Sequence, residues 1–186
     1  KVIPMTGWQR SYVWQDTGLT FVPPSPNIRS PRSALFYPGI GMFEATNVSV
    51  GRGTRLPFEQ FGAPWMKGEL MAEKLGALQL PGVTVSSTTF TPSSDLYAGQ
   101  SCSGVRLRVT DPYALRSVDI FVQAAVLLRD LSGTDFVPRW DEVARVTGSK
   151  DFEAMYKTGK SPHEILAVFK QSDDQFTKDR QPYLLY

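Results

Sequence analysis

An alternating segment, Val-Arg-Leu-Arg-Val at residues 105–109, indicates a β-strand with one apolar and one charged face. Working outward, residues 83–90 (Val-Thr-Val-Ser-Ser-Thr-Thr-Phe) are rich in β-branched side chains, which predicts a partner strand with one face lined by hydroxyl groups. Further short strands are expected at residues 2–5, around Asn47 and at residues 57–61. Together these segments predict a small β-sheet.

Helical signals follow the sheet segments. Residues 117–131 are apolar on nearly every side, which predicts a central buried helix capped by Ser117. Ser161, Pro162 and Glu164 form an N-cap, a first-turn proline and a capping box, and so predict another helix start. Shorter helices are expected after Ser30-Pro31 until Pro38-Gly39, and at residues 39–43, 68–78, 140–146 and 151–157. Because strands and helices are segregated along the chain, we expect an α+β fold, with the sheet covered by the Ser117 and Ser161 helices.

Composition excludes several classes of protein. The 186 residues, 41% hydrophobic and 20% charged, are typical of a globular chain with one core or two small ones. A formal net charge of +2, with mixed signs along the sequence, argues against a nucleic-acid partner. No apolar run approaches the ~20 residues of a membrane span. Cys102 has no second cysteine to pair with, and His163 is the only histidine, so we expect neither a metal site nor a cofactor.

Residues 44–54, Glu-Ala-Thr-Asn-Val-Ser-Val-Gly-Arg-Gly-Thr, concentrate the side chains that hold a polar ligand. Alternation over residues 47–50 puts the polar side chains on one side of a short strand, and Gly51 and Gly53 permit a tight turn around Arg52. A guanidinium beside backbone N–H groups suits a carboxylate, a phosphate or an acidic sugar. The predicted substrate-binding residues, which we expect on one polar face, are Asn27, Asn47, Ser49, Arg52 and Thr54.

Two features of this region have alternative interpretations. Glu44 is expected to end a short helical segment, where its carboxylate either faces a cleft or pairs with Arg52 or Arg55. Asn27 lies in a proline-rich loop, where its amide bonds either to a ligand or to its own turn. Between the two main strands, the connection at residues 91–104 is either a functional loop or a mobile surface loop.

Several short blocks of the sequence carry a resemblance to a known family. They include Pro4-Met5-Thr6-Gly7-Trp8, Tyr37-Pro38-Gly39, Glu44 to Thr54, Pro57-Phe58-Glu59, Gly62-Ala63-Pro64-Trp65 and Cys102-Ser103-Gly104-Val105. In order and spacing these blocks resemble the signature blocks of the NamZ-type exo-β-N-acetylmuramidases. The similarity continues to the terminal Tyr-Leu-Leu-Tyr, so that it covers essentially the whole chain. It departs at Ala45, where the family usually has glycine, a difference of one methyl group.

The resemblance implies a glycoside hydrolase that releases N-acetylmuramic acid from the non-reducing ends of peptidoglycan fragments. In such a protein a Rossmann-like amino-terminal domain supplies the catalytic glutamate from a Pro-Glu-His-Gly motif, which this sequence lacks. Residues 1–186 are therefore expected to form a single carboxy-terminal auxiliary domain, with residues 1–20 as a candidate connection from the amino-terminal domain. This domain would supply one wall of the substrate cleft and be inactive alone. The resemblance also implies a periplasmic or secreted location.

Glycoside hydrolysis usually needs two carboxyl groups. Glu44 is our candidate for one of them, or for a group that orients the sugar, and Glu59 is the second candidate. The competing interpretation of Glu44 is an ion pair that fixes the glycine-rich loop. For the whole chain, the competing class is a non-catalytic carbohydrate-binding or domain-interface module.

Overall fold

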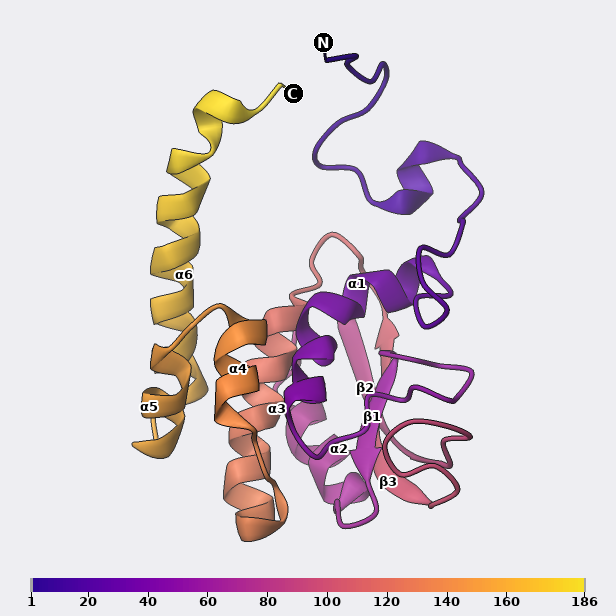
Figure 1. Ribbon diagram of the computed structural model, residues 1–186, viewed down its shortest axis with the longest axis vertical. Coiled ribbons are helices and arrows are strands. Elements are labelled where there is room, and N and C mark those ends of the chain that lie inside the picture. Colours follow the sequence, from indigo (N-terminus) through magenta and orange to yellow (C-terminus); the bar gives the residue numbers. More distant parts are fainter. Residues whose placement is uncertain (1, 186) are drawn as a thin grey trace.

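The computed structural model describes residues 2–185 and has an α+β architecture (Figure 1). Strands β1 (Gln60–Ala63), β2 (Val83–Phe90) and β3 (Cys102–Val109) form an antiparallel sheet in the order β1-β3-β2. Strands β2 and β3 pair along their full length, from Val83 opposite Val109 to Phe90 opposite Cys102. The pairing predicted from the two alternating segments is therefore confirmed.

Helices form the rest of the body. Helix α2 packs against β2 and β3, while α1 packs against α3, which also contacts α2 and α6. Short 3-10 turns connect these elements, and η2 (Gly41–Ala45) follows α1 directly. No helix in residues 2–185 is long and apolar enough to cross a membrane. The six helices of the described part are α1 (Pro31–Ile40), α2 (Gly68–Ala77), α3 (Ser117–Ser132), α4 (Trp140–Thr147), α5 (Asp151–Lys157) and α6 (Pro162–Asp179).

A cluster of phenylalanine side chains ties the helices to the sheet. Phe43 of η2 stacks on Phe61 of β1 with ring centroids 5.1 Å apart, and meets the edge of Phe121 of α3 at 4.9 Å. All three rings are fully buried, and each burial contributes roughly 1.5–3 kcal/mol. Because Phe43 directly precedes Glu44, this cluster sets the position of the candidate site.

Helix starts follow the capping signals at two of the three predicted positions. Ser30 accepts a hydrogen bond from the Ser33 backbone, and Ser161 accepts one from Glu164, each as part of a capping box. The prediction that Ser117 caps its helix is wrong: Arg116 is the N-cap, without a side-chain bond, and Ser117 lies inside the first turn. The Ser117 backbone instead contacts α1 closely, so that tertiary packing sets this helix start.

Three local predictions fail for physical reasons. Helix α1 continues through Pro38 to Ile40, because the burial of its apolar face outweighs the backbone bond that the proline removes. The expected strand at residues 57–61 starts only at Gln60, since Phe58 has a left-handed backbone (φ 64°) that a strand cannot include. Residues 2–5 form no strand.

The expected strand around Asn47 is also absent. Isolated bridges link Thr46 to Pro138 and Ser49 to Gly62, so the two ends of this segment pair with different parts of the chain. A regular strand would need one continuous partner on a given side, which this segment does not have.

Candidate functional site

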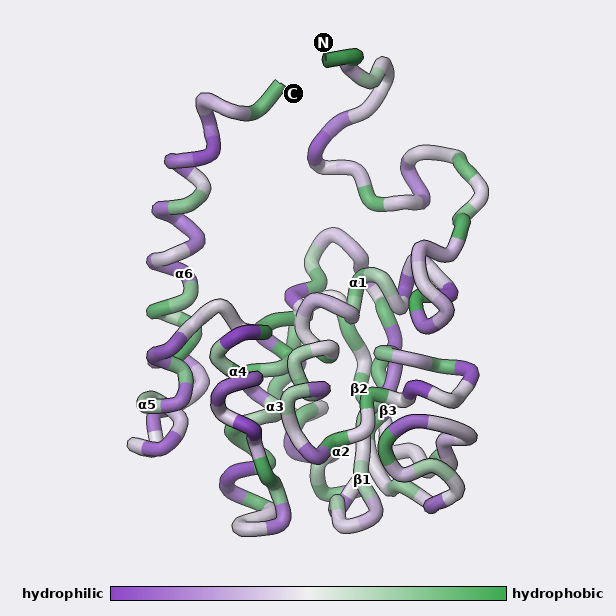
Figure 2. Tube along the Cα trace, in the orientation of Figure 1, coloured by the Kyte–Doolittle hydropathy of each residue, from purple (hydrophilic) through white to green (hydrophobic). Residues whose placement is uncertain are grey.

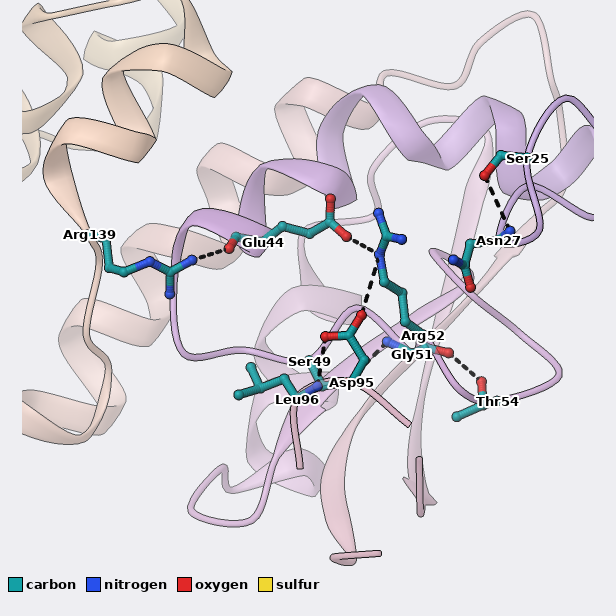
Figure 3. A network of polar contacts seen from close by, with 10 residues as sticks. All are labelled: Ser25, Asn27, Glu44, Ser49, Gly51, Arg52, Thr54, Asp95, Leu96 and Arg139. Carbon is teal, nitrogen blue, oxygen red and sulfur yellow. Dashed lines mark hydrogen bonds and ion pairs between the residues drawn. The ribbon is translucent and has the colours of Figure 1, made fainter. Parts of the chain in front are cut away.

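A small pocket of about 210 Å³ lies between η2, the glycine-rich loop and the loop that precedes β3. Apolar side chains of Val48, Val50 and Leu96 form part of its lining, together with the hydroxyl-bearing Ser49. Two acidic and two basic residues bring their charges to it, so that the formal charges balance. These four residues are Glu44, Arg52, Asp95 and Arg139 (Figure 3).

Arg52 is the residue around which the pocket is built. Its Nε donates a hydrogen bond to Glu44 Oε1 and lies 3.9 Å from Asp95 Oδ2 (Figure 3). The guanidinium also lies over the Phe58 ring, 5.4 Å from the centroid. The hydrogen bond to Glu44 raises the pKa of Arg52 above its ordinary value, against the opposing effect of burial. Arg52 is therefore charged and held in one orientation.

The two terminal Nη nitrogens of Arg52 differ from its Nε in their hydrogen bonding. Within residues 2–185, neither Nη atom donates a hydrogen bond, and the side chain is about one-third exposed. A planar guanidinium held through Nε can still present the one edge formed by its two Nη groups to a carboxylate. The pocket can thus bind a small acidic group while Glu44 stays paired.

Arg139 supports the pocket from the opposite side. Its Nη1 donates to the Thr46 carbonyl at 2.8 Å, its Nη2 donates to the Glu44 carbonyl, and its Nε donates to Glu142 at 2.8 Å. These bonds satisfy backbone oxygens at the end of η2, which have no helical partner. Arg139 lies more than 90 positions from both carbonyls, so sequence reasoning missed it and no local signal marks it.

Asp95 is the second acidic residue of the pocket, and sequence reasoning did not select it. It lies in the 91–104 connection, which was singled out only as a loop that either functions or moves. Its Oδ1 accepts a hydrogen bond from the Leu96 backbone at 2.7 Å, and its own backbone is left-handed (φ 70°). Positive φ is uncommon in a non-glycine residue and marks Asp95 as unusual, but this backbone angle is known only from the structure.

The structure brings three of the six predicted residues together: Glu44, Ser49 and Arg52 all line the pocket. Thr54 closes its own loop, donating to the Gly51 carbonyl at 2.6 Å (Figure 3). Asn27, Asn47 and Thr54 do not line the pocket. For Asn47 the reason is that no strand forms around it, so strand alternation does not apply there.

The remaining predicted residues serve other contacts. Asn47 bonds to the chain after α3: its Nδ2 donates to the Asp135 carbonyl at 2.7 Å, and its Oδ1 accepts from the Val137 backbone at 2.8 Å. Asn27 sits in a turn, where its backbone N–H donates to Ser25 Oγ at 3.4 Å (Figure 3). Asn47 therefore anchors the pocket wall to the segment that carries Arg139.

Glu59, the second carboxylate candidate, is a buried brace outside the pocket. It accepts hydrogen bonds from Ser30 Oγ at 2.9 Å and from Arg32 Nε at 3.3 Å. These bonds join the N-terminus of α1 to the residue before β1. The pairing of Glu44 with Arg52 is the arrangement that the ion-pair interpretation of Glu44 predicts.

Other reactive side chains show no sign of a site. Among residues 2–185, no cluster of three His, Cys, Asp or Glu side chains could hold a metal ion. Cys102 is buried, and burial raises the pKa of its thiol, which disfavours the reactive thiolate. His163 lies exposed in the first turn of α6.

Crystal structures with this architecture place the fold in a class of larger bacterial proteins. A DUF1343 family protein from Bacteroides fragilis NCTC 9343 superimposes with a TM-score of 0.86 at 28% identity, over 97% of this chain and 49% of that one. A second protein of that description from the same organism gives 0.64 at 30% identity, over 88% of this chain and 43% of the other.

The chain belongs to the NamZ family. The family described as exo-beta-N-acetylmuramidase NamZ, C-terminal, matches residues 35–186, and its N-terminal counterpart matches residues 1–32. The peptidoglycan beta-N-acetylmuramidase NamZ of Bacillus subtilis (strain 168) is 36% identical over 189 aligned residues. That alignment covers 100% of this chain and 45% of the relative, so the chain spans less than half of the relative's length.

The glycine-rich loop contacts the loop that precedes β3, and a substitution at Gly53 tests this contact. Ser93 bonds to the Gly53 carbonyl through both its backbone N–H (3.0 Å) and its hydroxyl (2.8 Å). A Cβ on Gly53 would lie 2.5 Å from the Ser94 carbonyl oxygen. We expect Gly53→Ala to lower the free energy of unfolding by about 2–4 kcal/mol and to displace Asp95, as measured by urea denaturation and by amide chemical shifts of residues 91–100.

Gly99→Ala is the matched control. Gly99 has almost the same backbone (φ 76° against 74°), but a Cβ added there would meet no atom within 4 Å. Only backbone strain of about 1–2 kcal/mol is therefore expected in this variant. Equal losses of stability in the two variants would contradict the role of the loop contact.

Proposed function

We propose that this chain is the carboxy-terminal part of a glycoside hydrolase that releases N-acetylmuramic acid from the non-reducing ends of peptidoglycan fragments. Membership of the NamZ family supports the reaction class. The pocket around Arg52 forms one wall of the substrate cleft, and the amino-terminal domain of the same protein forms the other. The chain alone is inactive, and the complete protein works outside the cytoplasm, where its substrate lies.

The observation that carries this proposal is the partly satisfied guanidinium of Arg52. N-acetylmuramic acid bears a lactyl carboxylate, and a carboxylate can accept two parallel hydrogen bonds from one guanidinium. Arg52 is fixed through Nε, so little conformational entropy is lost when its free N–H groups bind a ligand. Ser49 lines the same pocket and supplies a hydroxyl. Asn27, Asn47 and Thr54 contribute by shaping the surrounding loops.

Glu44 acts in this proposal by orienting Arg52 toward the sugar. In the complete enzyme, Glu44→Gln keeps the side-chain shape but removes the charge that holds Arg52. We expect kcat/KM for a chromogenic muramide to fall by about tenfold, the effect of weakening one charged hydrogen bond. Release of the chromophore measures this directly.

Glu73→Gln provides the control for this variant, because Glu73 is an exposed acid of α2 outside the pocket. It removes the same charge and should leave kcat/KM unchanged. Unchanged turnover in Glu44→Gln as well would exclude both a catalytic and an orienting role for Glu44.

One observation favours a second candidate function, that of a binding or interface module that catalyses no reaction. The formal charges in the pocket balance, and Glu44 is committed to Arg52, as expected for a structural brace. If the complete protein fails to release muramic acid while residues 1–186 still bind muramic acid in calorimetry, the module interpretation replaces the hydrolase.

A further inference from the structure

The second half of α6 is exposed to solvent along its whole length. Ile165 is buried and Phe169 packs against the core, but residues 170–179 are all exposed, and Phe176 is 63% exposed. Figure 1 shows α6 rising from the body toward the end where both chain termini lie. An apolar ring thus lies exposed on this segment, with the Arg180 guanidinium over it, 6.0 Å from the ring centroid.

Local interactions do not account for this projecting segment. Lys170 pairs with Asp174, and Gln175 donates to Asp179, each four residues apart along the helix. Such pairs stabilise a helix only weakly, and they leave the apolar ring of Phe176 exposed. A packing partner would explain this exposed phenylalanine.

A groove runs along the base of this segment. It encloses about 730 Å³ between α6, the start of α3 and the link from α4 to α5, and its lining is mostly polar and charged, with apolar side chains such as Leu166 and Phe169 among it. Asp119 of α3 lies half-buried in it and forms no hydrogen bond or ion pair with any described residue. Burial raises the pKa of Asp119 while Arg116 opposes the shift. This half-buried carboxylate is therefore available to a donor from another surface.

A second projecting segment lies across from α6. Residues 2–22 extend to the same end of the molecule as the α6 C-terminus (Figure 1), and hydrophobic residues alternate with hydrophilic ones along them (Figure 2). A hydrogen bond of 2.5 Å from the Tyr113 hydroxyl to Asp16 ties this segment to the body. The exposed large hydrophobic residues of this segment are Val2, Ile3, Met5, Tyr12, Trp14, Leu19 and Val22.

Sequence comparison indicates what covers this end. Residues 1–32 match the family's N-terminal unit, and more than half of the Bacillus relative has no counterpart in this chain. The projecting residues 2–22 thus belong, by sequence, to a unit whose bulk lies elsewhere in such proteins. We propose that residues 170–179 of α6, the groove at their base and residues 2–22 form the seat of this protein's own amino-terminal domain. The inference rests on the two-domain organisation proposed above and not on the sugar chemistry.

Hydrogen exchange of the complete protein tests this seat. The amides of residues 171–179 should exchange at least about tenfold more slowly in the complete protein than in residues 1–186 alone, because packing suppresses local opening. In the complete protein, Phe176→Asp should restore fast exchange there while residues 165–168 stay protected. Equal exchange rates at residues 171–179 in the complete protein and the shorter chain would overturn the proposal.

The control is Leu78→Asp, which introduces the same charge at an exposed leucine beyond the end of α2, away from α6. It should leave exchange at residues 171–179 unchanged. Light scattering distinguishes another occupant: protection that appears only at concentrations where the protein dimerises would assign the seat to a second copy and reject the proposal. Because exchange does not depend on turnover, a failed hydrolase assay would not affect this result.

Discussion

Replacing Gly39 by alanine is expected to lower the free energy of unfolding by about 3 kcal/mol or more. Gly39 lies in α1 where this helix crosses the start of α3, and a Cβ there would be 1.8 Å from the Ser117 carbonyl oxygen. The neighbours Phe36 and Ile40 are fully buried, so α1 cannot move away without opening the core. Overpacking against a backbone atom is costly because no side-chain rotation can relieve it.

Thermal or urea denaturation of residues 1–186 measures this effect, and Gly76→Ala supplies the control. Gly76 also lies in a helix, α2, but the nearest atom to an added methyl group is Val85 Cβ at an ordinary 3.9 Å. Alanine there should raise stability by roughly 0.5–1 kcal/mol through helix propensity. A stable Gly39→Ala variant would show that the α1–α3 crossing is not as tight as described.

The second large effect is expected on substrate handling. In the complete enzyme, Arg52→Ala should raise KM or lower kcat by roughly tenfold to a hundredfold, the loss of one charged hydrogen bond of about 1.5–3 kcal/mol. The melting temperature should change by only a few degrees, because an ion pair with both partners about one-third exposed contributes about 1 kcal/mol or less.

Arg55→Ala is the matched control for Arg52. Arg55 lies in the same loop, is exposed and forms no hydrogen bond or ion pair with other described residues, so its removal changes the charge equally without changing the pocket. Kinetics with a muramide substrate should be normal in this variant. If Arg52→Ala instead unfolds at a much lower temperature and the remaining folded enzyme handles substrate normally, Arg52 is a structural brace.

Sequence reasoning succeeded where the determining interactions are local. Alternation over residues 105–109 and β-branched content over residues 83–90 located β3 and β2, whose pairing the structure confirms. The Ser30-Pro31 pair and the capping box at Ser161 located the starts of α1 and α6, because these signals act within three or four residues. The resemblance blocks led to the NamZ family, which the comparisons confirm.

For the candidate site, sequence alone selected the acid and the base that meet, Glu44 and Arg52, which are eight residues apart. It did not select Asp95 or Arg139, which also line the pocket but lie 43 and 87 residues after Arg52 in the sequence. The position of these two side chains at the pocket depends on core packing, because the cluster of Phe43, Phe61 and Phe121 fixes η2 against β1 and α3.

The difference between local interactions and tertiary packing also explains why the predicted strand around Asn47 does not form. Alternation around Asn47 is a local pattern, but a strand forms only when a partner runs alongside, and tertiary packing gives Thr46 and Ser49 different partners. Local chemistry therefore determined which segments of this chain become helices and which become the paired strands β2 and β3. Tertiary structure alone decided where α1 ends, which side chains close the pocket and which helix face remains uncovered, because each depends on surfaces brought together from distant parts of the sequence.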